Sequence, residues 1–308
     1  MKLALVAAVV SMLVLTAAAF VAIRHLAHTF TPGSMSLGRL IVGSFALGLA
    51  LMVSRSWTPM TRRDWTVVAA VGVLLFGVYN IALNAGEARV DAGTAALVSQ
   101  VSPAAVALLA VLMLGERLTV QVVLGMVLAF VGVATIAVGA STTMEGDLAG
   151  VVLCLVSALA YAIGAVLEKP LVTRLPALQI TWIGCTVGAA VCLPFAGSLR
   201  REALVASTTD LGWLVFLGIG PTAVAFATFA FALRHMSASA LGITTYLIPP
   251  VTIVMSVLLL SEAPPSAAYL GGVLTLLGVA IAQTKRQAPR PLRVTSPRAR
   301  REAGARPH

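Results

Sequence analysis

The chain is short of charge. Asp, Glu, Lys and Arg make up only 10% of its 308 residues, whereas 59% are hydrophobic. Soluble globular proteins average about 25% charged residues, so this shortage excludes a water-soluble enzyme. The charges form short islands between apolar runs of roughly 17 to 25 residues, the length that crosses a bilayer core as a helix. The sequence also lacks the alternating segments of about 10 residues that are typical of membrane strands. It therefore predicts an all-α integral membrane protein.

Cysteine and catalytic motifs are scarce as well. The three cysteines, Cys154, Cys185 and Cys192, all fall within apolar runs, where a thiol acts as a small packing residue. Their spacing fits neither a disulfide framework nor a metal site. The sequence has no GxxxxGK[ST] phosphate-binding loop, so ATP hydrolysis is not indicated. No convincing nucleophile–base–acid set can be assembled at membrane depth. We expect neither an enzyme nor a cofactor.

The net charge of +10 raises the possibility of nucleic-acid binding, but the positions of the basic residues argue against it. Eight Lys and Arg residues lie in the segment 284–308, which also holds four prolines. Such a composition predicts a disordered tail. A basic tail next to a last membrane helix is attracted to anionic membrane lipid; the alternative is a solubilising tail that only sets the topology. We expect no nucleic-acid partner.

The apolar runs predict ten transmembrane helices. The first run resembles a signal peptide, but it is longer than the usual apolar region of about 7–15 residues and is interpreted as the first helix. The connections are short and leave no room for a soluble catalytic domain. The predicted spans are Leu3–Ile23, Ser36–Val53, Trp65–Leu83, Ala92–Leu114, Val120–Gly139, Leu148–Leu167, Ile180–Ala196, Leu211–Leu233, Ala238–Leu260 and Ala267–Gln283.

The distribution of Lys and Arg in the loops predicts the orientation, because cytoplasmic loops carry the excess of both. If the N-terminus is cytoplasmic, sixteen such residues fall on the cytoplasmic side and four on the other. Without the tail the count is still eight against four. Both termini are therefore expected in the cytoplasm, with the chain multi-pass in the inner, or plasma, membrane.

The two halves of the sequence match at one constant offset of 146 residues. The segments 1–140 and 147–283 are thus predicted to be two five-helix domains, followed by the tail at 284–308. Because five is odd, the second copy enters the membrane from the opposite side, and such inverted repeats recur in secondary transporters. Matched pairs of acids, prolines and glycines carry this prediction: Asp64 and Asp210, Gly72 and Gly218, Pro103 and Pro249, Glu116 and Glu262, Gly125 and Gly271, and Gly132 and Gly278.

These features resemble the drug/metabolite transporter superfamily, specifically its ten-helix branch with two EamA-type domains. The resemblance covers Leu3 to Gln283 and implies transport, often efflux, of amino acids or other small metabolites. In the second half Ser261 replaces the usual glycine, and no arginine corresponds to Arg39. The residues that carry the resemblance are the fourth-helix prolines, the Gly115-Glu116 and Ser261-Glu262 turns, the fifth-helix glycines, Pro32 before the second helix and Arg39 within it.

Two symmetric polar clusters flank the mid-span prolines Pro103 and Pro249. A proline removes one helical hydrogen bond, and irregular backbone survives at membrane depth only inside protein or beside a cavity. The clusters are predicted to bind substrate; the alternative is that they only hydrogen-bond helices together. Their members are Ser99, Gln100 and Ser102, and then Thr244, Thr245 and Tyr246.

Further candidates lie on other spans. Arg39 either anchors an anionic substrate group, pairs with Glu87 or Asp91, or extends to the membrane surface. Tyr79 and Tyr161 are cavity candidates, and Asn80 and Asn84 serve either as substrate ligands or as packing groups. The charged island of Glu87, Arg89 and Asp91 is interpreted as a solvated loop, and Glu116 and Glu262 as helix caps. The small residues of the fifth and tenth helices allow close packing within the monomer, with a homodimer contact as the alternative.

Together these patterns predict a secondary transporter that moves a small neutral or zwitterionic solute, such as an amino acid, by alternating access. Two alternatives stay open: a lipid-carrier flippase, which predicts a cavity open sideways to lipid, and a membrane scaffold that transports nothing, which predicts no response to any ligand.

Overall fold

The protein is described from a computed structural model, which covers residues 2–103, 105–106, 108–109, 120–141, 148–172, 174–235, 244–261, 264 and 266–283. Within these residues every regular element is a helix. The first half comprises α1 (Lys2–Leu26), α2 (Pro32–Ser54), α3 (Arg62–Val71), the π-helix η1 (Gly72–Val78), α4 (Tyr79–Glu87), α5 (Ala92–Ser99) and α7 (Val120–Ser141).

The second half repeats this order. It comprises α8 (Leu148–Val172), α9 (Ala177–Val191), the 3₁₀-helix η2 (Leu193–Phe195), α10 (Ala196–Val205), α11 (Thr208–Leu217), the π-helix η3 (Gly218–Val224), α12 (Ala225–His235), the 3₁₀-helix η4 (Thr245–Leu247), α14 (Ile248–Leu260) and α15 (Ser266–Gln283). Several predicted features, namely Glu116, Glu262 and the tail at 284–308, lie outside the described residues.

The backbone follows the 146-residue offset closely. The π-helix η1 begins at Gly72 and η3 begins at Gly218, and both are seven residues long. Each follows a ten-residue helix with the same start: Thr61 caps α3 by accepting from the Asp64 amide, and Ser207 caps α11 by accepting from the Asp210 amide. Such caps satisfy backbone donors that a helix leaves unpaired. The two halves therefore share unusual local geometry as well as sequence.

Helix breaks precede both mid-span prolines. α5 ends at Ser99 with Gln100 as its C-cap, and helical residues resume at Ser102 and Pro103. In the second half η4 interrupts the path immediately before α14, which holds Pro249 in its first turn. Proline is accommodated at the start of a helix because its missing N–H would be unpaired there. The predicted disruption near the prolines is thus present in both halves.

Five helical stretches of the described chain are long and apolar enough to cross a membrane. A sixth is α9 with the helical stretch Leu193–Val205, bent by 53° at Cys192, two residues before Pro194. The predicted seventh span is therefore not one straight segment, because proline cannot continue the helical ladder. Ten spans stay a prediction. The five single stretches are Leu3–Leu26, Pro32–Ser54, Arg62–Glu87, Leu148–Val172 and Thr208–Phe229.

Each half packs its third span on the first two helices of the other half. α4 lies on α8 and α12 on α1, while η1 packs on α9 and η3 on α2. Glycine allows the last two contacts: a Cβ on Gly72 would lie 2.6 Å from Val187 Cβ, and one on Gly218 would lie 2.6 Å from Val42 Cβ. The repeats are thus interlocked, and neither forms a separate bundle.

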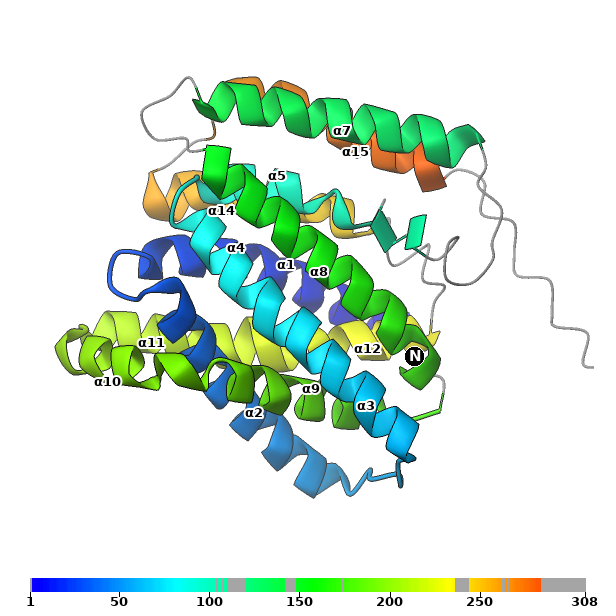
Figure 1. The fold of residues 1–308 in the computed structure, drawn as a ribbon, viewed down its shortest axis with the longest axis vertical. Coiled ribbons are helices and arrows are strands. Elements are labelled where there is room, and N and C mark those ends of the chain that lie inside the picture. Colours follow the sequence, from blue (N-terminus) through cyan, green and yellow to red (C-terminus); the bar gives the residue numbers. More distant parts are fainter. Residues whose placement is uncertain are drawn as a thin grey trace, which may run out of the picture.

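The fifth helices of the two halves form a pair of their own. α7 and α15 run side by side along one edge of the bundle (Figure 1). Gly132 lies directly against Gly271 and Thr275 of α15, so the small residues serve packing within the monomer, as predicted. Large apolar side chains such as Val123, Val127 and Phe130 are exposed on the pair. In a membrane protein such a surface faces lipid.

Reciprocal polar contacts join the helix ends. Arg174, in the loop after α8, donates to Asp64 at 2.6 Å. His25 in the last turn of α1 and Thr29 after that helix contact Asp210 at 3.1 and 3.2 Å. The hydrogen bond to the Asp64 carboxylate raises the pKa of Arg174 above its ordinary value. Asp64 and Asp210, which lie at the start of the third span in each half, therefore each contact the region where the first helix of the other repeat ends.

Candidate functional site

A polar face runs along α4 in the interior of the bundle. Asn80, Asn84 and Glu87 are spaced by four and three residues, which places them on one side of a helix. All three are buried, with relative exposures of 3%, 0% and 0%. Buried polar groups in proteins are nearly always hydrogen-bonded, so each atom on this face needs a partner from the protein or from a ligand.

Arg39 of α2 supplies the positive charge of this region. It is 4% exposed, and its Nε donates to Thr222 Oγ1 in η3 at 3.2 Å. Thr222 in turn donates to Leu217 O at 2.9 Å, five residues earlier, so the π-helix positions the acceptor. Arg39 interacts electrostatically with Glu87 and Tyr79. The side chain thus lies inside the protein and does not extend to the membrane surface.

The predicted aromatic candidates lie on facing helices. Tyr79 begins α4 and Tyr161 belongs to α8, and their ring centroids are 5.7 Å apart at an interplanar angle of 52°. Tilted rings at this separation have a favourable geometry. Both rings are only partly buried. Through Tyr79, which contacts Tyr161 and interacts electrostatically with Arg39, the structure brings these three candidates into one region.

The two asparagines use one end of each amide for packing. Asn80 Nδ2 donates to Phe76 O at 2.7 Å, and Asn84 Nδ2 donates to Ser36 Oγ at 2.9 Å. Their Oδ1 atoms have no hydrogen-bond partner in the described chain, and the same holds for Arg39 Nη1 and both Glu87 carboxylate oxygens. One cationic donor and several acceptors are thus left for a ligand, a proton or water.

A second polar group lies where the two helix breaks meet. Gln100 is 5% exposed, and its Nε2 donates to Thr245 O at 3.4 Å, so two predicted site residues from the two halves are in contact. The Gln100 Oε1 has no partner within the described residues. Ser99 Oγ donates to Ala95 O at 2.8 Å, which commits its proton to the helix. Tyr246 belongs to η4, and its side chain lies outside what is described.

The position of Glu87 differs from the sequence prediction. The island of Glu87, Arg89 and Asp91 was expected to be a solvated loop, but Glu87 is fully buried. The reason is a helix boundary: the third span was predicted to end at Leu83, whereas α4 continues to Glu87. The additional turn keeps the carboxylate on the same face as Asn80. That spacing was the signal in the sequence that could have identified it.

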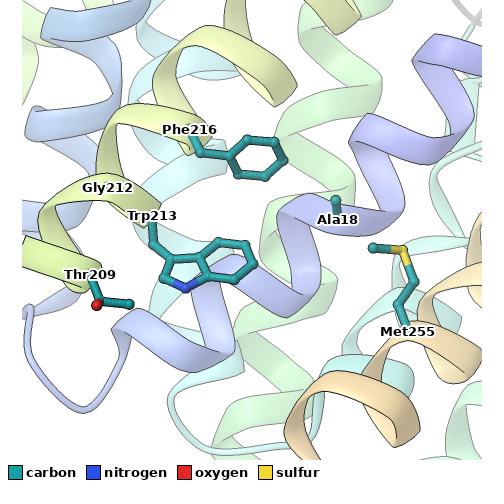
Figure 2. A pocket seen from close by; sticks show the side chains of 6 residues that line it. All are labelled: Ala18, Thr209, Gly212, Trp213, Phe216 and Met255. Atoms are coloured by element: carbon teal, nitrogen blue, oxygen red, sulfur yellow. The ribbon is translucent and has the colours of Figure 1, made fainter.

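An open pocket of about 380 Å³ lies apart from these groups, between α1, α11 and α14 (Figure 2). Trp213 and Phe216 of α11 stack edge to face with centroids 5.6 Å apart, and Met255 of α14 faces them across the pocket in Figure 2. The Thr209 hydroxyl and the Trp213 indole N–H are the polar side-chain groups among the residues described as lining it, the others being Ala18, Gly212, Phe216 and Met255. Such a lining suits an apolar group.

A family model and the similar proteins all point to membrane transporters. The model of the EamA-like transporter family matches residues 2–138 and 148–284. A probable terminal-alkyne amino-acid exporter of Streptantibioticus cattleyicolor is 32% identical over 88% of this chain and 91% of its own length. The uncharacterized transporter YdfC of Bacillus subtilis is 30% identical over 89% of both chains.

One solved structure, named only as the crystal structure of a protein, has a TM-score of 0.59 to this chain. It covers 89% of this chain and 94% of its own, with 20% sequence identity. At that identity the likeness shows a common fold and nothing further.

Proposed function

This chain belongs to the EamA-like transporter family, with two EamA domains, and on that premise we propose that it exports a small zwitterionic solute of the amino-acid class. The chain is a multi-pass membrane protein and a transporter, not an enzyme, so its substrate is a small molecule that crosses the membrane unchanged. The class of that molecule, the direction and the site residues make up the proposal.

The observation that carries the proposal is the set of unpartnered buried atoms around Arg39. Inside an apolar bundle these atoms would be costly to leave unpaired. Arg39 offers a free guanidinium nitrogen, which suits a carboxylate. Asn80 and Gln100 each offer an unpartnered amide oxygen, and such oxygens accept from an ammonium group. A zwitterion satisfies both kinds of group at once, whereas a polyanion would leave the acceptors unpaired.

The remaining proposed substrate ligands form two groups, one beside Arg39 and one beside Gln100. Tyr79 and Tyr161 form one wall beside Arg39, on α4 and α8. Ser99, Thr245 and Tyr246 belong to the helix breaks beside Gln100. Support for the amino-acid class and for export comes from the relative in Streptantibioticus cattleyicolor, which is named as a probable amino-acid exporter.

The proposed architecture is ten membrane helices in two inverted five-helix domains, spanning 1–140 and 147–283, with both termini cytoplasmic. The interlocked third spans support it, because α4 and α12 occupy equivalent places on opposite halves. Rocking of one half against the other would open the central site alternately to each side. The membrane is the plasma membrane, and the working unit is a monomer or a homodimer.

The test is a substrate screen of purified protein. At a hundred times Kd a bound ligand stabilises the native state by about 2.7 kcal/mol, so a thermal-shift series of amino acids, nucleobases, sugars and cationic drugs should single out amino acids. Counterflow of the same compound in proteoliposomes then shows transport. Arg39→Ala should strongly reduce both signals, while Arg62→Ala, at the exposed start of α3, serves as the matched control. A preference for polyanions would contradict the proposal.

A lipid-carrier flippase is the second candidate, because the pocket in Figure 2 is open and almost wholly apolar. It predicts scrambling of a fluorescent polyprenyl-phosphate lipid in liposomes, and no thermal shift with any soluble solute. The polar interior around Arg39 favours the amino-acid proposal over this one.

A further inference from the structure

The carboxyl group of Glu87 has no role in the substrate site proposed above. It is 0% exposed, and neither of its oxygens has a hydrogen-bond partner within the described residues. The neighbouring backbone is tied down, since Arg24 Nη1 donates to the Glu87 carbonyl oxygen at 3.2 Å. The main chain is thus held while the carboxyl group is left without a donor.

Charged and titratable groups surround Glu87 on every packed element. α2 contributes Arg39, α1 contributes Arg24, and the N-cap of α5 contributes Asp91. Cys154 faces it from α8, and Tyr79 interacts with it from its own helix. Two cations therefore lie within electrostatic reach of Glu87, and neither donates to its carboxylate oxygens.

This arrangement favours a different charge state in each conformation. In the closed interior an ionised carboxylate without a donor is strongly disfavoured, and binding a proton removes the charge. When water reaches the site, the two arginines favour the ionised form instead. Closing and opening of the bundle would then load and release one proton.

We propose that Glu87 is the proton-binding site that couples export to proton entry, an inference that rests on the proposed transport function. A proton from water on one side adds to a carboxylate oxygen, giving a neutral carboxylic acid, and leaves to water on the other side. No bond of the solute forms or breaks. The proton gradient drives the cycle, and the equivalent position in the second half is Leu233, so the repeat supplies no second carboxyl group there.

The experiment compares wild type, Glu87→Gln, Glu87→Asp and the control Glu202→Gln in proteoliposomes. Two modes are measured for the amino acid identified by thermal shift: counterflow without a pH gradient, and accumulation driven by a pH gradient. Glu87→Gln should keep counterflow and lose gradient-driven accumulation, because a neutral amide mimics the protonated state. Glu87→Asp and the control should keep both.

Two outcomes overturn the inference. If Glu87→Gln retains gradient-driven accumulation, the proton binds elsewhere. If it loses counterflow as well, with a raised KM, Glu87 is a substrate ligand.

A second measurement needs no substrate. Infrared spectra of wild type minus Glu87→Gln should show the carbonyl band of a protonated carboxylic acid, and its absence overturns the inference even if no amino acid is transported. Failure of counterflow in wild type with this band present would instead count against the proposed substrate class alone. Melting temperatures of all variants establish that each one folds.

Discussion

The third span of the first half and its counterpart in the second half have the same backbone and opposite chemistry. Both contain a capped first segment and a seven-residue π-helix. Yet four interior polar residues of the first half, on α2 and α4, are replaced in the second by an apolar residue or a cysteine. At the 146-residue offset, Arg39 corresponds to Cys185, Asn80 to Phe226, Asn84 to Ala230 and Glu87 to Leu233.

The packing follows this difference. Phe226 stacks on Phe76 with ring centroids 5.2 Å apart, and the buried Cys185 donates a weak hydrogen bond to Leu40 O at 3.4 Å. One half thus presents a polar surface and the other a mostly apolar one. Symmetric backbones suit a motion that must work in both directions, whereas binding chemistry is needed only once. After the duplication, the two halves kept the same backbone geometry while their interior side chains diverged.

The largest expected effect is a loss of substrate affinity when Arg39, the charged residue of the polar half, is replaced. Arg39→Ala removes a charged donor, and a hydrogen bond involving a charged group contributes about 1.5–3 kcal/mol. We expect the substrate Kd to rise roughly ten- to a hundredfold. Cys185→Ala, at the equivalent position, should leave Kd unchanged. Isothermal titration of both variants checks this, and an equal loss in the two would show that the halves are not chemically different.

The next prediction compares two glycines at equivalent positions, which should affect stability equally but substrate binding differently. Gly72→Ala and Gly218→Ala each place a Cβ 2.6 Å from a valine Cβ, and overpacking of this kind costs about 1–3 kcal/mol. Both should lower the melting temperature by similar amounts. Only at Gly218 is the Arg39 carbonyl oxygen among the nearest atoms, at 2.9 Å.

Gly218→Ala should therefore also weaken substrate binding, and Gly72→Ala should not. Melting curves with and without substrate measure the two effects separately. Equal losses of affinity would contradict the assignment of the site to the α2 side.

A smaller effect tests the reciprocal end contacts. Asp64→Ala and Asp210→Ala each remove a residue that binds the N-cap side chain, and loss of an N-cap costs about 0.5–2 kcal/mol. Asp64→Ala should be the more destabilising, because Asp64 is the more buried and accepts the 2.6 Å bond from Arg174. Thermal unfolding followed by tryptophan fluorescence gives the ranking, and the reverse order would refute it.

The smallest effect concerns the aromatic wall. Tyr161→Phe keeps the ring contact with Tyr79 and removes only the hydroxyl, so we expect a loss of about 0.5–1.5 kcal/mol in substrate binding and no change in melting temperature. Leu15→Met, at the position of the first half that corresponds to Tyr161 at the 146-residue offset, is the control. A change in stability without a change in affinity would make Tyr161 a packing residue.

The sequence determined the helical membrane class, because its lack of charge excludes a soluble core. It also determined the duplication, because matched acids and prolines without a gap rarely coincide by chance, and the π-helices and helix breaks follow the same offset. Arg39, Tyr79 and Tyr161 could be named as candidates because polar residues in apolar spans are costly and therefore noticeable.

Only the tertiary structure decided how these elements meet. The burial of Glu87 depends on four residues at the end of α4, below the precision with which a helix end can be predicted. The interlocking of α4 with α8 and of α12 with α1 joins residues far apart in the chain, and periodicity carries no information about such partners. The polar side chains were visible in the sequence, but whether their hydrogen-bonding atoms find partners is a property of packing alone.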